Sequence, residues 1–157
     1  MSNPSEQEHV KLPLPPPMVF VIPLVLGLIA NAIFPMPFIP TEWAWIAGAI
    51  SGVLGLLLAG WAIRTLFRAG DSPDPDRPVR ALVTKGPFAF TRNPIYLGFA
   101  FLYGGVALFF DSPVTLILLP VVLYVHTRVI IQREEAYLAS RFEADYLSYK
   151  GRVRRWL

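Results

Sequence analysis

The sequence predicts an all-α fold: an integral membrane bundle of about four transmembrane helices, followed by a C-terminal amphipathic helix. Of the 157 residues, 54% are hydrophobic and only 16% are charged, and the mean hydropathy is +0.49. Soluble domains carry about 25% charged residues. Apolar stretches long enough to enter a membrane recur along the chain, and the basic residues gather on alternate connections between them.

The apolar stretches define the predicted spans. They are Met18–Phe34, Trp43–Phe67, Ile95–Phe110 and Pro113–Ile131. A membrane helix needs about 20 apolar residues, within a range of roughly 17–25, so the first, second and fourth stretches are long enough. The third is shorter, and only Asp111 and Ser112 separate it from the fourth. We therefore expect these two stretches to form a tight helical hairpin in the membrane.

Composition narrows the classes of function. The chain has no cysteine, which excludes disulfides, thiol nucleophiles and Cys-ligated metals, and we predict no metal site. The net charge of +3 and the pI near 9.4 come from basic residues that flank the apolar spans. We expect anionic lipid headgroups, and not nucleic acid, as their partners. Residues 1–17 are predicted to be a disordered lead, and residues 18–157 a single membrane domain.

The basic residues also predict the orientation of the chain. One group lies in or beside the second connection and comprises Arg64, Arg68, Arg77, Arg80, Lys85 and Arg92. Another lies towards the C-terminal end and comprises Arg128, Arg133, Arg141, Lys150, Arg152, Arg154 and Arg155. The connections at 35–42 and 111–112 contain none. By the positive-inside rule, both termini and the 68–94 connection face the cytoplasm.

The segment from Thr84 to Gly98 is the strongest candidate for a functional site. It is polar, contains Gly and Pro, and leads directly into the third apolar stretch. Non-helical backbone near membrane depth is tolerated where protein or a water-filled cavity surrounds it. Asn93-Pro94 has a structural explanation, because Asn is a favoured N-cap and Pro a favoured first helical residue. The same helix start offers free N–H groups to a ligand, with Tyr96 one turn further as a hydrogen-bond donor.

Two adjacent glutamates, Glu134 and Glu135, follow the fourth stretch without a break in the helical pattern. At helical spacing Arg128, Gln132 and Glu135 share one face, and Glu134 points to a neighbouring face. Charged helix ends are usually solvated and carry ion pairs at i,i+3 or i,i+4. Adjacent carboxylates beside a membrane can instead hold the ammonium group and ribose hydroxyls of a cationic cofactor.

Beyond the glutamates, apolar and aromatic residues recur at helical spacing, at Leu138, Phe142, Tyr146 and Tyr149. This pattern predicts an amphipathic helix at the level of the headgroups, which could also cover a pocket as a lid. His126 is the one histidine inside a predicted span, and ionisable residues there are functional candidates. Because no second His or Cys is placed to share a metal, we expect a neutral, hydrogen-bonded side chain.

Taken together, four motifs resemble those of the isoprenylcysteine carboxyl methyltransferase and phospholipid methyltransferase families. They are Leu82-Val83-Thr84-x-Gly86-Pro87-Phe88, Arg92-Asn93-Pro94-x-Tyr96-x-Gly98, Glu134-Glu135-x-x-Leu138 and Phe142-x-x-x-Tyr146-x-x-Tyr149-x-x-x-Val153. The resemblance covers roughly residues 60–157. Members of this superfamily are helical membrane enzymes that use S-adenosylmethionine. The resemblance therefore implies a methyltransferase of a bacterial inner membrane. Its acceptor would be lipophilic or lipid-anchored, either a carboxylate or an amine, and would react at the cytoplasmic face.

The resemblance also implies a cofactor site. In the family, the segment before and through an Arg-His-Pro-x-Tyr motif and the glutamate pair hold S-adenosylmethionine. Carried over by position, the implied contacts come from Arg80, Ala81, Leu82, Val83, Phe88, Asn93, Pro94, Ile95, Tyr96, Glu134 and Glu135. From charge and position alone, we assign Arg128 and Arg133 to orienting an anionic acceptor.

Two positions depart from the family pattern. Asn93 stands where better-known members have His, and an amide donates and accepts hydrogen bonds but does not transfer a proton near neutral pH. Glu143 replaces the Gly of the usual Phe-Gly-x-x-Tyr, which predicts continuous helix there in place of a tight turn.

Two other functions are compatible with the sequence. Sterol reductases share a similar C-terminal Arg-x-x-His-Pro-x-Tyr region and use a nicotinamide cofactor, so an NADPH-dependent membrane reductase is one alternative, although those enzymes generally have more spans. A non-enzymatic membrane scaffold is the other. In a scaffold, Asn93-Pro94 would be only a helix cap and the glutamate pair only a solvated helix end.

Overall fold

The computed structural model describes residues 12–74 and 77–157, and the first eleven residues of the predicted lead lie outside this part. All regular secondary structure within it is helical. The long helices are α1 (Pro16–Ile33), α2 (Thr41–Arg68), α3 (Pro94–Phe109), α4 (Pro113–His126) and α5 (Gln132–Arg152). Two short elements are the 3₁₀-helix η2 (Gly86–Ala89) and the π-helix η3 (Thr127–Ile131). The prediction of an all-α fold is confirmed.

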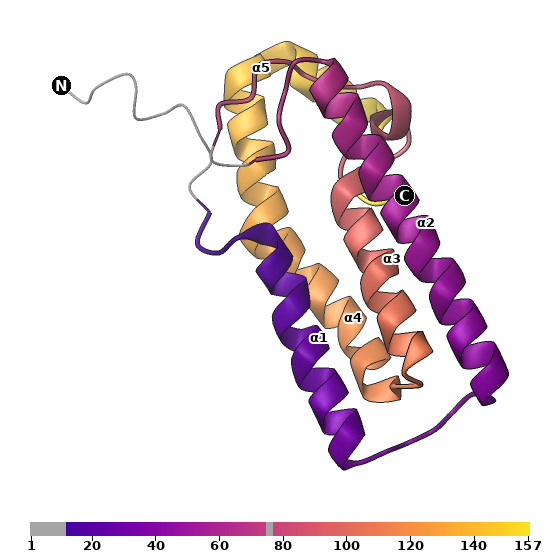
Figure 1. Ribbon diagram of the computed structural model, residues 1–157. Coiled ribbons are helices and arrows are strands. Elements are labelled where there is room, and N and C mark those ends of the chain that lie inside the picture. Colours follow the sequence, from indigo (N-terminus) through magenta and orange to yellow (C-terminus); the bar gives the residue numbers. More distant parts are fainter. Residues whose placement is uncertain (1–11, 75–76) are drawn as a thin grey trace.

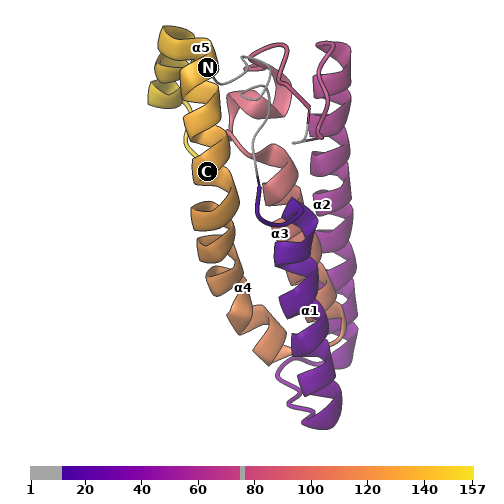
Figure 2. The same ribbon diagram turned by 90° about the vertical axis from the view of Figure 1, so that its left-hand side faces the viewer.

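Helices α1 to α4 run alongside one another in an elongated bundle (Figure 1). α2 packs along α3, the turn at residues 110–112 returns the chain as α4, and α1 packs along α4. Figure 2 shows α1 and α4 next to each other from a second direction. The end of the bundle far from the turn at residues 110–112 carries α5, η2 and the connection that follows α2. Segments distant in sequence therefore meet at that end.

The helices have the length and surface of membrane-spanning segments. α1, α2 and the helix from Pro113 are long and apolar enough to cross a bilayer, and α3 is a shorter apolar helix. Their outward faces carry large hydrophobic side chains such as Leu26, Leu57 and Ile117. In water such a surface would be costly, whereas lipid solvates it. The structure thus confirms a membrane helical bundle with the predicted hairpin.

The start of α1 differs slightly from the prediction. The helix begins at Pro16, inside the predicted lead and before Met18. Proline is tolerated in the first turn of a helix, because the N–H that it lacks would have no intrahelical partner there. The two prolines at this position therefore begin the helix and do not delay it.

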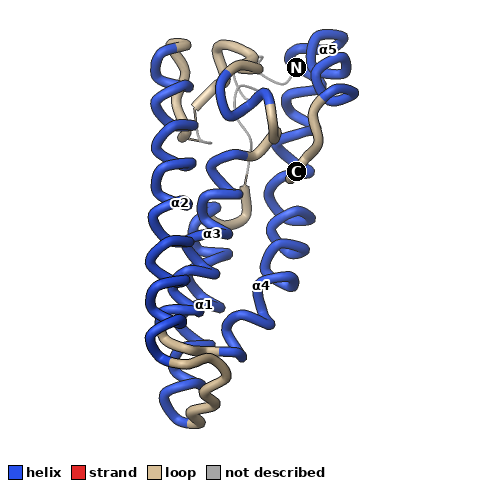
Figure 3. Tube along the Cα trace, turned by 90° about the vertical axis from the view of Figure 1, so that its right-hand side faces the viewer, coloured by secondary structure: helices blue, strands red, loops and turns tan. Residues whose placement is uncertain are grey.

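α4, η3 and α5 follow one another without an intervening loop, and α5 extends beyond the other helices of the bundle (Figure 3). A π-helical turn contains an extra residue per hydrogen-bonded ring and so rotates the side chains that follow it. α5 begins at Gln132, after the last apolar residue of the predicted span. Glu134 and Glu135 consequently lie outside the membrane-spanning segment.

Helix α5 is not straight, and the prediction of continuous helix at Glu143 is wrong. Glu143 has φ 42° and ψ −116°, so its backbone turns within α5. A positive φ costs a non-glycine residue about 1–2 kcal/mol, and contacts beyond the turn offset that cost. The Tyr149 hydroxyl donates to the Phe88 carbonyl oxygen at 2.7 Å, and Arg92 donates to the Tyr146 hydroxyl at 3.3 Å.

α2 and α3 approach so closely that their contact requires glycine. A Cβ added to Gly55 would lie 2.6 Å from the Gly98 carbonyl oxygen, and one added to Gly105 would lie 2.7 Å from the Gly52 nitrogen. In the membrane, where lipid is as apolar as the side chains, such close packing is a main source of helix association. The small residues of α2 therefore have a packing role, which fixes the position of α3.

We expect Gly55→Ala to destabilise the bundle by about 1–3 kcal/mol, as for other overpacked cores, because the new methyl group meets backbone. Gly60, on the same helix, has nothing within 4 Å of its added Cβ. Gly60→Ala should be neutral or stabilise by up to about 1 kcal/mol, since alanine is the better helix former. Thermal unfolding of both variants in one detergent measures the difference, and equal melting temperatures would contradict the packing argument.

Candidate active site

A cavity of about 170 Å³ lies where α5, the α2–α3 connection and the start of α3 meet. Its lining combines apolar, aromatic and charged side chains. The lining residues are Leu66, Asp71, Ser72, Pro73, Asp74, Val79, Ala81, Leu82, Val83, Phe88, Arg92, Asn93, Pro94, Ile95, Tyr96, Glu134, Glu135, Tyr137, Leu138, Tyr146 and Tyr149. A concave site of this kind is the default place for a ligand in a protein.

The cavity brings together most of the residues that the family resemblance implied. Ten of the eleven implied cofactor residues line it, and the exception is Arg80, whose side chain is exposed. Arg128 and Arg133 are also exposed and do not line this cavity. The Arg128 guanidinium lies over the Tyr124 ring, 5.7 Å from its centroid. Their assignment to the acceptor therefore has no support from the cavity.

Glu134 enters the cavity from the first turn of α5 and faces α3. The Tyr96 hydroxyl donates a hydrogen bond of 2.5 Å to Glu134 Oε1. Burial raises the pKa of Glu134 to about 7; the hydrogen bond from Tyr96 acts in the opposite direction, and the negative charge of Glu135 adds to the rise. Near neutral pH this carboxyl therefore exchanges readily between its two protonation states, which is typical of functional groups.

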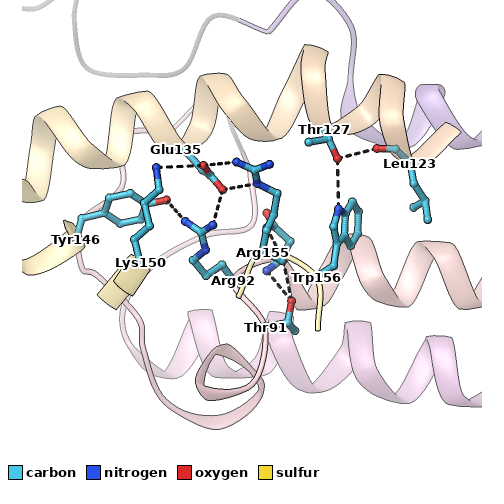
Figure 4. Close-up of polar contacts among 10 residues, drawn as sticks. Thr91, Arg92, Leu123, Thr127, Glu135, Tyr146, Lys150, Arg155 and Trp156 are labelled. Carbon is cyan, nitrogen blue, oxygen red and sulfur yellow. Dashed lines mark hydrogen bonds and ion pairs between the residues drawn. The ribbon is translucent and has the colours of Figure 1, made fainter. Parts of the chain in front are cut away.

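Glu135, the next residue, is the centre of an ion cluster. Its carboxylate receives a bidentate pair of hydrogen bonds from Arg155, at 2.8 and 2.9 Å, and lies 3.2 Å from Arg92 and 3.7 Å from Lys150 (Figure 4). Burial by itself would raise the pKa of Glu135, but the hydrogen bond from Arg155 and the three positive charges outweigh it and lower the pKa. Glu135 is thus an ionised structural group with its hydrogen-bonding capacity used within the protein.

The last residues, 153–157, fold back beside the cavity, and we name them the C-terminal strap. The Arg155 carbonyl oxygen accepts hydrogen bonds from Thr91 Oγ1 at 3.0 Å and Asn93 Nδ2 at 2.9 Å. The Arg154 carbonyl oxygen accepts one from the Arg92 N–H at 3.0 Å. Trp156 Nε1 donates to Thr127 Oγ1 at 3.3 Å (Figure 4). The strap therefore connects the start of α3 with η3.

The strap corrects the predicted role of the Asn93 side chain. Asn93 occupies the N-cap position of α3 with Pro94 as the first helical residue, as predicted, but its side chain makes no capping hydrogen bond. The amide donates to the strap instead, while Thr91 Oγ1 accepts from the Asn93 N–H at 3.2 Å. Asn93 thus holds the start of α3 against the C-terminal strap.

Arg92 is a site residue that the sequence argument did not select. Its side chain lines the cavity, and its Nε is buried without a hydrogen-bond partner among the described residues. The sequence feature that could have identified Arg92 is its position beside Asn93 in a motif that resembles the family's. A buried unpaired donor is costly. An anionic group of a ligand is the natural partner for it.

The connection after α2 contains a buried carboxylate. Asp71 is buried, with one carboxylate oxygen accepting from the Ser72 N–H at 2.8 Å and the other from the Ala81 N–H at 3.5 Å. These bonds fold the loop over the cavity, where Asp71 and Asp74 form part of the lining. Tyr137, Tyr146 and Tyr149 of α5 line another part. Tyr146 and Tyr149, with Leu138, belong to the amphipathic pattern for which the sequence suggested a position over a pocket.

His126 also departs from its prediction. The side chain is fully buried, but neither ring nitrogen has a hydrogen-bond partner in the described part of the chain. Its ring lies edge-on to Tyr96, with 4.3 Å between centroids, and tilted towards Phe20 at 4.9 Å. The expected hydrogen bond is absent because aromatic side chains surround the imidazole.

Comparison with known proteins identifies the family to which the chain belongs. A model of the phospholipid methyltransferase family matches residues 43–145. The chain belongs to the phospholipid methyltransferase family. It is 29% identical over 108 residues to a protein-S-isoprenylcysteine O-methyltransferase of Saccharomyces cerevisiae, which covers 69% of this chain and 43% of that protein. The match to the Schizosaccharomyces pombe protein of the same name is 31% over 110 residues, 66% of this chain and 47% of that protein.

The chain therefore spans somewhat less than half the length of these two relatives. The matched family region contains α2, α3, α4 and the first part of α5, and so includes most of the residues that line the cavity. The C-terminal strap lies beyond residue 145 and outside the matched region.

We predict that the two adjacent glutamates differ in their effect on stability. Glu135→Gln should cost about 3 kcal/mol, because removing one partner of a buried ion pair leaves Arg92 without its counter-charge. Glu134→Gln should change stability by about 1 kcal/mol or less, because the neutral form of this carboxyl is already accessible near neutral pH. Thermal denaturation of both variants at pH 7 tests this difference. A Glu134→Gln variant as unstable as Glu135→Gln would contradict the assignment.

Proposed function

We propose that this protein transfers a methyl group from S-adenosylmethionine to a lipophilic or lipid-anchored acceptor that reaches the cavity from the bilayer. The observation that carries the proposal is the placement of ten implied cofactor residues around one cavity at the end of a membrane bundle. The family match favours methyl transfer over the reductase and scaffold alternatives.

The residues around the cavity suit the chemical groups of the cofactor. Arg92 Nε, which is buried and has no partner among residues 12–74 and 77–157, is a donor for the methionine carboxylate. Glu134 is a carboxylate for the ribose hydroxyls or the ammonium group, and Phe88 is an aromatic surface for adenine. Ala81, Leu82, Val83, Pro94 and Ile95 supply apolar and backbone contacts. Two other carboxylates line the cavity: Asp71 is buried, and Asp74 is paired with Arg77 at 3.2 Å.

The cavity is smaller than the roughly 300 Å³ at the lower end of sites for drug-sized ligands. A nucleoside cofactor would therefore displace part of the wall. The Asp71–Asp74 stretch of the α2–α3 connection is non-helical and lies over the cavity, so its displacement would leave the helices in place. Asn93 and Glu135 would hold the rest of the site during that displacement, since both are bonded to the C-terminal strap.

The cofactor supplies an electrophilic methyl group, so the reaction asks for positioning and exclusion of water more than for acid or base catalysis. A carboxylate acceptor arrives ionised and needs no base. This suits the present site, where Asn93 cannot transfer a proton and its amide is bonded to the strap. The names of both fungal relatives describe O-methylation of an S-isoprenylcysteine. We accordingly propose a lipophilic carboxylate as the acceptor.

We also propose that the cavity end of the bundle, with the C-terminus, faces the cytoplasm, because the basic residues gather there and because the cofactor is cytosolic. The chain has no cysteine, so one introduced thiol reports its own accessibility. Lys85→Cys should react with an impermeant thiol reagent only after cells are permeabilised, whereas Thr41→Cys at the start of α2 should react in intact cells. The reverse pattern would place the cavity on the outer side of the membrane and contradict the proposed orientation.

The decisive experiment combines cofactor binding with methyl transfer. Purified protein in lipid is expected to bind S-adenosylhomocysteine and to transfer labelled methyl from S-adenosylmethionine to S-farnesyl-N-acetylcysteine. Glu134→Gln should weaken S-adenosylhomocysteine binding by about 1.5–3 kcal/mol, the usual value of a hydrogen bond to a charged group. The matched control is Asp145→Asn, which neutralises an exposed carboxylate outside the cavity lining.

The same assay has a pH signature. If the ligand binds ionised Glu134, whose pKa is about 7, the affinity should fall about tenfold from pH 8 to pH 6, as the carboxyl takes up its proton. Glu134→Gln should remove this dependence. Unchanged binding in Glu134→Gln, or binding of NADPH with no binding of S-adenosylhomocysteine, would reject the proposed cofactor site.

A further inference from the structure

His126 is a buried polar group that the proposed cofactor site does not use. It is the last residue of α4, its exposed fraction is 0%, and both ring nitrogens lack a hydrogen-bond partner within the described chain. A neutral imidazole always has one N–H donor and one acceptor nitrogen. Burying both without partners is unfavourable, so its presence among aromatic side chains calls for an explanation.

Packing alone does not explain the residue. The ring contacts Tyr96 and Phe20, which are contacts that a phenylalanine would make without the cost of unpaired polar atoms. The π-helical turn η3 starts immediately after His126. Such turns cost stability and are often found at functional sites. Both observations indicate a role that requires the nitrogens of the imidazole.

The position of His126 relative to the cavity indicates that role. Tyr96 contacts both places: its hydroxyl bonds to Glu134 in the cavity, and its ring meets the His126 ring. His126 thus lies one aromatic ring away from the proposed cofactor site, on the side of the apolar bundle formed by α1, α3 and α4. An acceptor entering from the bilayer would approach the cofactor from this side.

We propose that His126 binds the polar head of the acceptor, donating a hydrogen bond from its imidazole to a carboxylate carried on a lipophilic tail. Binding requires a rotamer change of Tyr96 or Phe20 to admit the head. The inference rests on the proposed methyl transfer and adds the group that orients the acceptor. It gives this role to the buried His126 in place of Arg128 and Arg133, whose side chains are exposed.

The proposed step balances without a base. A carboxylate oxygen of the acceptor attacks the methyl carbon, a C–O bond forms and the C–S bond breaks, and the electron pair stays on sulfur to give S-adenosylhomocysteine. His126 holds the other carboxylate oxygen and keeps its proton throughout. It is a binding and orienting residue, and the reaction needs no proton transfer from it.

The test is the binding and methylation of S-farnesyl-N-acetylcysteine by the parent protein, His126→Phe and His126→Gln. Phenylalanine retains the packing, so His126→Phe should fold with equal or higher thermal stability and bind S-adenosylhomocysteine like the parent. It should bind the farnesylated carboxylate at least about tenfold more weakly than the parent, as for other lost hydrogen bonds to a charged group. Its KM for this acceptor should rise correspondingly. His126→Gln retains an N–H donor and should recover part of the affinity.

Tyr103→Phe is the matched control. Tyr103 is also buried, its hydroxyl has no partner in the part of the chain that the structure describes, and it belongs to the core cluster of Phe20. This change should leave acceptor binding within about twofold. The inference would be overturned if the parent and His126→Phe bound the acceptor equally, or if Tyr103→Phe lost as much affinity as His126→Phe. It would also be overturned if the parent protein did not bind the farnesylated carboxylate. Loss of methyl transfer with His126-dependent binding intact would instead reject the proposed function and leave the acceptor site standing.

Discussion

The ion cluster at Glu135 is the constraint on which the site depends. One buried carboxylate joins Arg92 at the start of α3, Arg155 in the C-terminal strap and Lys150 near the end of α5. An unpaired charge in this position would be strongly unfavourable, so the three segments are held to one arrangement. That arrangement determines where Arg92 and Asn93 lie and brings Tyr146 and Tyr149 to the cavity. The unfavourable backbone of Glu143 is a local cost of the same closure.

Close packing in the membrane complements this polar cluster. The glycine contacts between α2 and α3 fix the helix that carries Asn93, Pro94 and Tyr96, and they need no polar groups. The bundle therefore has a rigid apolar part that positions α3 and a polar end that completes the cavity. Functional groups placed on such a scaffold keep their geometry better than groups on free loops.

The two adjacent glutamates have different roles in the site. Glu135 is ionised and bonded within the protein, whereas Glu134 accepts a hydrogen bond from Tyr96 and has a pKa of about 7. On the other wall, Asn93 is bonded to the strap, and Arg92 bonds to Glu135 and Tyr146 while its Nε has no partner among the described residues. Glu135 and Asn93 thus stabilise the site, and we propose that Glu134 and the Nε of Arg92 are the groups that contact a ligand.

The sequence by itself determined the membrane bundle and the approximate limits of its spans, and it predicted most of the residues that meet at the cavity. Apolar stretches and family motifs are local, so a linear sequence contains them in full. The sequence could not assign different roles to neighbouring residues of the same or similar type. Whether Glu134 or Glu135 is free depends on which distant cations face each one, and the strap that supplies Arg155 meets the start of α3 only after folding. The unpaired nitrogens of His126, the buried Asp71 and the turn at Glu143 likewise follow from long-range contacts, which the tertiary structure alone decides.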